Sequence, residues 1–202
     1  MFPHPSPLPE GEGEERVVIM KRCGFTLIEL MTVVSIISIL AAIAVPNFMN
    51  AQYRAKVARS IAEQEILAWA VESYFVDQDH YPPNAQAGTA SPWDLVPITT
   101  PIAYISQLPE DIFLAPNNVE KGGFIEVTRK GNRSYYYVNF VQQYGGRMSL
   151  APYGKKGSAN FVVYGLGPTY TNTFDPGKPE TFIEYSPSNG TVSEGNVFTF
   201  GP

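Results

Sequence analysis

Cysteine, histidine and runs of basic residues are scarce in this chain, and each shortage disfavours a class of function. One cysteine among 202 residues excludes a disulfide framework and a cysteine-rich metal site. The 14 lysines and arginines form no long run and the formal net charge is −5, which disfavours a nucleic-acid partner. Charged residues make up 16% and apolar residues 44%, a composition that excludes a disordered chain. We expect one ordinary domain with an appendage.

The common catalytic motifs are also missing. The sequence contains no Gly-x-Ser-x-Gly, no His-Glu-x-x-His and no phosphate-binding loop. Gly165 and Gly167, followed by Pro168, fit a turn better than a dinucleotide site. The adjacent acids Glu110 and Asp111 are interpreted as solvated loop charges rather than a catalytic pair. We therefore predict no enzymatic activity, and a membrane-anchored periplasmic enzyme is the alternative with the least support.

Residues 1–24 have the composition of a leader. Residues 1–19 are rich in proline, glutamate and glycine and cannot start a packed element, so we expect them to be disordered. Met20 opens the basic stretch Met-Lys-Arg-Cys-Gly. We hypothesise that translation starts at Met20, and the sequence leaves a start at Met1 open.

A long apolar run follows the leader. Residues 25–45 contain one charged residue, Glu29, and as a helix they would extend about 32 Å, enough to cross a hydrocarbon core of about 30 Å. Lys21 and Arg22 precede the run and the next basic residue is Arg54, so the N-terminal end should face the cytoplasm. A cleaved secretory signal is the alternative, but the length of the run and its carboxylate disfavour it.

The residues around Gly24 resemble a known processing signal. Arg-Cys-Gly-Phe-Thr-Leu-Ile-Glu, residues 22–29, is similar to the cleavage site of type IV prepilins and type II secretion pseudopilins. The resemblance implies cleavage between Gly24 and Phe25 by an inner-membrane prepilin peptidase, followed by N-methylation of Phe25. It also implies that the apolar segment is retained, because the cut precedes it.

Glu29 lies inside the apolar run, where a carboxylate costs about 2.5–3.5 kcal/mol on insertion scales. The resemblance implies that it pairs with the new N-terminal amine of Phe25 in a neighbouring subunit, so that each charge relieves the desolvation of the other. The alternative is a glutamate whose side chain reaches back to the lipid headgroups.

Pro46 ends the apolar run and should kink or locally melt the helix. Residues 46–76 form its amphipathic half, whose apolar face should pack on the head. That face comprises Val57, Ile61, Leu67, Ala68, Val71, Tyr74 and Phe75. Ile66 and Trp69 lie off this face, where a bundle of helices in a fibre could cover them. Trp69 could equally lie under a loop of its own head.

Residues 77–202 should form a globular head with a loop-rich region and an antiparallel sheet. Asp77, Asp79 and His80 are interpreted as solvated turn residues rather than metal ligands, because no fourth ligand follows at a suitable spacing. In the loop-rich region we expect Trp93 to pack against the long helix. Aromatic and β-branched runs separated by turn signals predict strands at residues 124–128, 135–141, 160–164, 181–185 and 196–200.

The sequence therefore predicts an α+β protein with a long N-terminal helix, kinked near Pro46, packed on an antiparallel sheet. The resemblance implies a structural subunit of a filament like the type IV pilus, most similar to a major pseudopilin that drives protein export. A type IV pilus subunit for adhesion, motility or DNA uptake stays open. Cys23 is the only cysteine and lies in the leader, which favours a pseudopilin because many pilus subunits close a C-terminal loop with a disulfide.

The resemblance also implies partners and a location. The partners are copies of the chain, the prepilin peptidase, a platform protein of the inner membrane, a cytoplasmic assembly ATPase, minor pilins or pseudopilins, and inner-membrane lipid. The subunit would cross the inner membrane once, with its head in the periplasm. We assign no cofactor. Major pseudopilins have a calcium-binding loop near the C-terminus; residues 175–200 show no matching dense cluster of aspartates, and calcium binding by the C-terminal head stays an open alternative.

Overall fold

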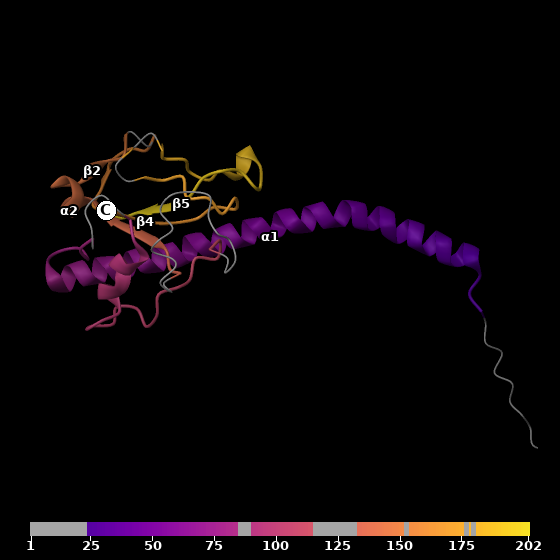
Figure 1. The fold of residues 1–202 in the computed structure, drawn as a ribbon, viewed down its shortest axis with the longest axis horizontal. Coiled ribbons are helices and arrows are strands. Elements are labelled where there is room, and N and C mark those ends of the chain that lie inside the picture. Colours follow the sequence, from indigo (N-terminus) through magenta and orange to yellow (C-terminus); the bar gives the residue numbers. More distant parts are fainter. Residues whose placement is uncertain (1–23, 85–89, 115–132, 152–153, 176–177, 179–180) are drawn as a thin grey trace, which may run out of the picture. The chain divides into compact units, whose positions relative to one another are not determined.

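The computed structural model describes residues 24–84, 90–114, 133–151, 154–175, 178 and 181–202. The chain divides into two compact units, residues 1–43 and 44–202. Helix α1, Leu27–Gln78, has 52 residues and begins in the first unit (Figure 1). Among the described residues it is the one helix long and apolar enough to cross a membrane.

The hydroxyl groups of the apolar half of α1 are bonded within the helix. Ser35 Oγ donates to the carbonyl of Met31 at 2.8 Å, and Ser38 Oγ donates to that of Val34 at 2.7 Å. Such bonds to the preceding turn satisfy these hydroxyl groups without water. This half of the helix is therefore compatible with lipid although it contains serine.

Pro46 lies inside α1, and the helix continues on both sides of it. The proline lacks an amide hydrogen, so it removes one bond of the helical ladder without ending the helix. Local melting at this position is not observed, and the kink stays a prediction.

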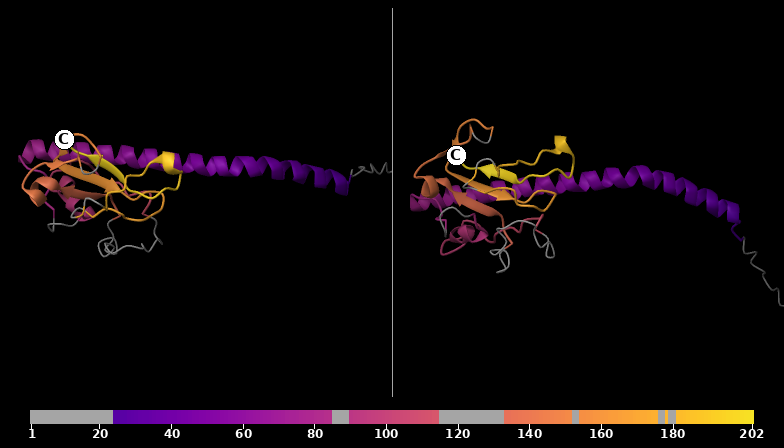
Figure 2. Two further views of the ribbon diagram at one scale, coloured as in Figure 1. Left: turned by 90° about the horizontal axis from the view of Figure 1, so that it is seen from above. Right: turned by 45° about the horizontal axis from the view of Figure 1, so that its top comes forward.

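The second unit packs the C-terminal part of α1 against an antiparallel sheet, as expected of an α+β fold. The sheet has the strand order β1-β4-β5, with β1 at Tyr136–Asn139, β4 at Phe161–Gly165 and β5 at Val197–Phe200. In the pairing of β1 with β4, Tyr137 lies opposite Val163. In the pairing of β4 with β5, Val163 lies opposite Thr199. Figures 1 and 2 show the sheet alongside the C-terminal part of α1.

Shorter elements surround this sheet. A two-stranded hairpin consists of β2, Met148–Ser149, and β3, Ser158–Ala159. Helix α2 spans Phe140–Tyr144, and the 3₁₀ helices η1 and η5 span Pro92–Ile98 and Pro187–Asn189.

Both faces of the sheet are covered, so all three consecutive tyrosines 135–137 are buried. Tyr135 and Tyr137 face α1 and share a core with Leu67 and Val71. Tyr136 points to the opposite face and stacks on Tyr164 with ring centroids 5.2 Å apart. The alternation of side chains along a strand explains this division. The face toward α1 therefore buries two of these tyrosines and the opposite face buries the third.

The helix face that packs on the sheet differs in part from the predicted one. Val57, Leu67, Ala68 and Val71 are buried, Tyr74 and Phe75 are half-buried, and Ile61 is exposed. The polar residues Ser60 and Gln64 take its place on the buried face, where Gln64 Nε2 donates to Ser60 Oγ at 3.1 Å. Periodicity of apolar residues alone could not place these two because their mutual hydrogen bond reduces the cost of burial.

The two tryptophans are both solvent-accessible. Trp69 is 69% exposed and does not lie under a described loop of its own head. Trp93 was expected to pack against α1 but is 40% exposed, whereas its neighbours Leu95 and Ile98 are buried in the core next to the helix. Successive side chains of a 3₁₀ helix are about 120° apart, so Leu95 and Ile98, three residues apart, lie on one side of η1. Trp93 lies on a different side and points away from the core.

Three predicted strands are confirmed: those at 135–141 and 196–200 contain β1 and β5, and that at 160–164 overlaps β4. The prediction at 181–185 was wrong, because this segment makes a single bridge between Glu184 and Asn196. Gly195, next to this bridge, has a φ of 128°, which lies outside the strand conformation, so the pairing does not extend past Asn196 in that direction. The predicted strand at 124–128 lies outside the described residues.

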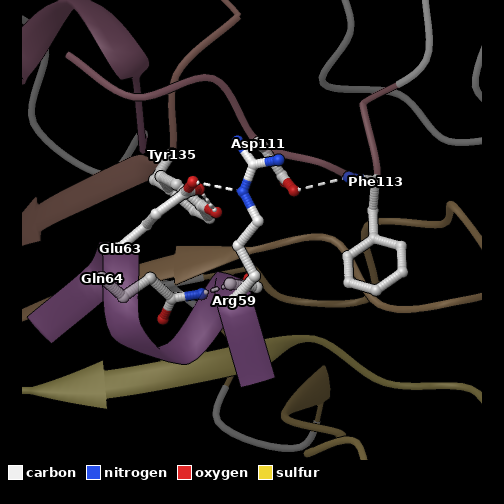
Figure 3. Close-up of polar contacts among 7 residues, drawn as sticks. Arg59, Glu63, Gln64, Asp111, Phe113 and Tyr135 are labelled. Carbon is white, nitrogen blue, oxygen red and sulfur yellow. Dashed lines mark hydrogen bonds and ion pairs between the residues drawn. The ribbon is translucent and has the colours of Figure 1, made fainter. Parts of the chain in front are cut away.

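Asp111 corrects an interpretation of the sequence. It is only 2% exposed, and one carboxylate oxygen accepts a hydrogen bond from the backbone of Phe113 at 2.9 Å (Figure 3). The other carboxylate oxygen accepts from the backbone of Leu166 at 2.7 Å. The carboxylate therefore ties the loop before β1 to the end of β4. Gly165 ends β4 and leaves room for this contact, since a Cβ there would lie 3.0 Å from Asp111 Oδ2 and 2.8 Å from the Tyr135 ring.

A second polar contact joins α1 to the sheet. Tyr135 Oη donates to Glu63 Oε2 at 2.6 Å, and Arg59 Nε donates to Glu63 Oε1 at 2.7 Å (Figure 3). Burial, and then the bond to the Glu63 carboxylate, raise the pKa of Tyr135 well above its ordinary value. Glu63 thus sets the position of the helix against the sheet.

We expect Asp111→Ala to lower the free energy of unfolding by about 2–4 kcal/mol, because two buried N–H groups lose their acceptor. Urea unfolding of the full chain in detergent, followed by circular dichroism, measures the change. The matched control is Glu110→Ala, whose side chain is exposed and should change stability by less than about 0.5 kcal/mol. Equal stability of the two variants would contradict the structural role of Asp111.

Tyr135→Phe should lower the free energy of unfolding at neutral pH by about 1–3 kcal/mol through loss of a hydrogen bond to a charged group. It should also reduce the loss of stability at alkaline pH. Unfolded tyrosine ionises near pH 10 and folded Tyr135 ionises higher, so this residue makes stability fall as pH rises above about 10. Unfolding series at several values of pH test this, with Tyr53→Phe as control; unchanged alkaline sensitivity would contradict it.

Candidate processing and assembly site

The residues of the predicted cleavage site lie directly before α1 and are open to solvent. Gly24, Phe25 and Thr26 are non-helical and exposed. A Cβ atom added at Gly24 would meet no other atom of the described chain within 4 Å. The packing of this chain therefore does not require glycine at that position, and any requirement must come from a protein that binds there.

Thr26 and Glu29 form a capping box at the start of α1. The Glu29 backbone N–H donates to Thr26 Oγ1 at 3.3 Å, and the Glu29 carboxylate accepts from the Thr26 backbone N–H at 2.9 Å and from its hydroxyl at 2.6 Å. These bonds satisfy two backbone donors that the first helical turn leaves unpaired. The sequence carries this signal as Thr-x-x-Glu before an apolar run.

The capping box gives Glu29 a partner within its own chain. Before cleavage Phe25 has an amide nitrogen in a peptide bond with Gly24, so the amine proposed to pair with Glu29 does not yet exist. Within the described residues, the donors to this carboxylate are the neutral groups of Thr26. A charged amine from another subunit would add a stronger, charge-assisted bond.

The residues considered for metal binding make other contacts. Asp77 accepts a hydrogen bond from Tyr104 Oη at 3.0 Å, and the His80 ring stacks on Tyr74. Near the C-terminus, Glu184 pairs with Lys155 at 2.8 Å. Within the described residues, no three His, Cys, Asp or Glu side chains lie close enough together to hold a metal ion.

Comparison with known proteins places the site in a family. Residues 19–45 match the family model described as the prokaryotic N-terminal methylation motif. The chain is 52% identical over 58 residues to type IV major pilin protein PilA of Myxococcus xanthus, an alignment that covers 29% of this chain and 26% of the relative. The chain belongs to the type IV pilin and pseudopilin family.

Two further relatives represent both branches of this family. Type IV major pilin protein PilE1 of Neisseria gonorrhoeae is 45% identical over 69 residues, which cover 34% of this chain and 32% of the relative. Type II secretion system core protein G of Escherichia coli K12 is 36% identical over 98 residues, 45% of this chain and 66% of the relative. The chain spans less than half the length of the first pilin relatives it matches. No solved structure matched it.

These relatives are named as pilins and as a secretion-system core protein, which agrees with the expectation of a chain without enzymatic activity. The apolar helix and the methylation motif together indicate a membrane-anchored subunit. The roles in cleavage, methylation, assembly and kinking stay predictions for Gly24, Phe25, Glu29 and Pro46.

We expect Gly24→Val to block processing, because a β-branched side chain would occupy the space in which the peptidase binds the glycine. The variant should fold normally, since the position is open in the chain itself. Coexpression with a prepilin peptidase and measurement of the intact mass test this. Ser35→Ala, a change within the apolar run, serves as the control that should still be cleaved; mature protein from Gly24→Val would contradict the cleavage site.

Proposed function

We propose that this chain is a pseudopilin, a structural subunit that polymerises from the inner membrane to drive protein export by a type II secretion system. The observation that carries the proposal is the alignment with core protein G, which extends over 98 residues, against 58 and 69 for the two pilins described above. An alignment of that length continues past the helix into the head. The lack of cysteine beyond Cys23 also favours a pseudopilin.

The proposed mechanism is mechanical and depends on the apolar half of α1. None of residues 25–49 is buried in the described structure, so this surface needs lipid or other helices around it. The membrane would hold the subunits after cleavage, and helices of neighbouring subunits would replace lipid in the filament. Self-association by head-to-tail contacts that do not close generates a helical filament.

Glu29 would direct the entry of each subunit into the filament. After cleavage the amine of Phe25 and the carboxylate of Glu29 are both charged groups at the edge of an apolar medium. Pairing the amine of one subunit with the carboxylate of its neighbour relieves the desolvation of both, and it fixes their relative height. A prepilin peptidase, a platform protein, an assembly ATPase and minor subunits would be the partners in this process.

A type IV pilus subunit is the second candidate. The identities with the pilins PilA and PilE1, at 52% and 45%, exceed the 36% with core protein G, although they are confined to shorter segments. Expression in two reporter strains separates the candidates: one lacks its major pseudopilin and the other its major pilin. Restored secretion in the first strain alone supports a pseudopilin, whereas surface pili in the second strain alone would overturn that assignment.

We expect Glu29→Ala to be cleaved and inserted but to yield at least about tenfold less filament, because the amine of the neighbour loses its charged partner. Filaments sheared from cells and quantified by immunoblot measure the effect. Thr26→Val is the matched variant: it removes the hydroxyl of the capping box but keeps the carboxylate, so it should assemble much better than Glu29→Ala. Normal filament yield from Glu29→Ala would contradict charge pairing.

A further inference from the structure

Trp69 belongs to an exposed stripe on the face of α1 that points away from the sheet. The stripe comprises Ala62, Ile66, Trp69, Ser73 and Val76, which alternate in steps of three and four residues. All five are exposed, and Trp69 lies at the centre. Exposed tryptophans flanked by apolar residues are typical of protein interfaces, in which tryptophan and arginine contribute most to affinity.

A groove lies elsewhere on the second unit, between α1 and the segment that leads into η5. Its volume is about 510 Å³, and its walls are formed from the helix and from Tyr185, Pro187 and Ser188. The helix residues that line it are Arg54, Val57, Ala58 and Ile61. A hydrogen bond of 2.6 Å from Thr191 Oγ1 to Asn50 Oδ1 ties the same loop region to the helix beside the groove.

Along the C-terminal part of α1, the basic residues precede the acidic ones. The basic residues of the helix, Arg54, Lys56 and Arg59, come first, and no Lys or Arg follows before its end. The acids Glu63, Glu65, Glu72 and Asp77 come after them. Arg54 and Glu65 are exposed and have no ion-pair partner within the described part of the chain. Two parallel copies displaced along the helix axis would therefore bring opposite charges together.

We propose that Trp69 of one copy occupies the groove at Ala58 of a second copy in the filament, with Glu65 beside Arg54. This second copy is a different neighbour from the one whose amine pairs with Glu29, because that pairing offsets two helices by only about four residues. The proposal rests on the proposed function, since it assigns the contact between neighbouring heads of the same filament. Trp69 lies 11 residues after Ala58, and Glu65 lies 11 residues after Arg54. One displacement of about 17 Å along the helix thus satisfies both contacts. Arg54 would also lie near the face of the inserted ring, a favourable cation–π arrangement.

The two surfaces of this contact differ, which makes the contact directional. The stripe lies opposite the sheet, whereas the groove opens beside the loop of residues 185–188. Ala58 and Trp69 are about three helical turns apart, so they lie on nearly the same side of α1 and meet their partners at different heights along the helix. A contact between unlike surfaces with a fixed displacement extends indefinitely and produces a filament rather than a closed dimer.

Trp69→Ala tests the stripe. We expect at least about tenfold less filament in the shearing assay, because a central tryptophan is removed from the interface. The thermal midpoint of the variant in detergent should match that of the unaltered chain, since the side chain is mostly exposed. Trp93→Ala is the matched control, an exposed tryptophan outside both surfaces, and should assemble normally. Normal yield from Trp69→Ala would overturn the proposal and leave the filament function intact.

Charge reversal tests the pairing itself. Arg54→Glu and Glu65→Arg should each lower the yield at least about fivefold, because like charges meet across the interface. The double variant should recover to within about twofold of the unaltered chain, which a purely structural effect of either change would not produce. Lys56→Glu and Glu194→Arg change the net charge equally outside the contact and serve as controls. A double variant no better than the single ones would overturn the pairing, and an unaltered chain without filaments would overturn the proposed function instead.

Discussion

The constraint on which the rest of the structure depends is the uncovered apolar half of α1. A helix with one charge in 21 residues is unstable in water unless lipid or other helices surround it. Its serine hydroxyls are bonded to the preceding turn, and its single carboxylate is held in a capping box. The uncleaved chain is thereby suited to lipid, and the charged amine produced by cleavage would favour association between subunits.

The second unit holds the C-terminal part of the same helix through apolar and polar contacts. Leu67 and Val71 pack on the tyrosines of β1, and Glu63 bonds Tyr135 across the same interface. Asp111 fastens the preceding loop to β4. Because the buried face of the helix is fixed in this way, Trp69 and its neighbours are directed outward, where they are available to another copy.

The long helix, the sheet and the processing motif could be predicted from the sequence because each follows from a pattern of adjacent residues. The role of Asp111 could not, since its partner Leu166 lies 55 residues away and the sequence shows only two neighbouring acids. The segment at 181–185 has the composition of a strand, but it makes only one bridge, to Asn196, beside Gly195 with its positive φ. The exposure of Trp93 and Ile61 could not be predicted either, because the apolar character of a side chain does not determine which face of its helix is buried.

The measurement that tests the central claim most directly is the intact mass and N-terminal sequence of the unaltered protein, extracted from membranes after coexpression with a prepilin peptidase. The account predicts a chain that begins at Phe25, with or without one methyl group on its amine. An uncut chain in the presence of active peptidase, or a chain that begins after Ala44, would contradict a filament subunit anchored by its N-terminal helix.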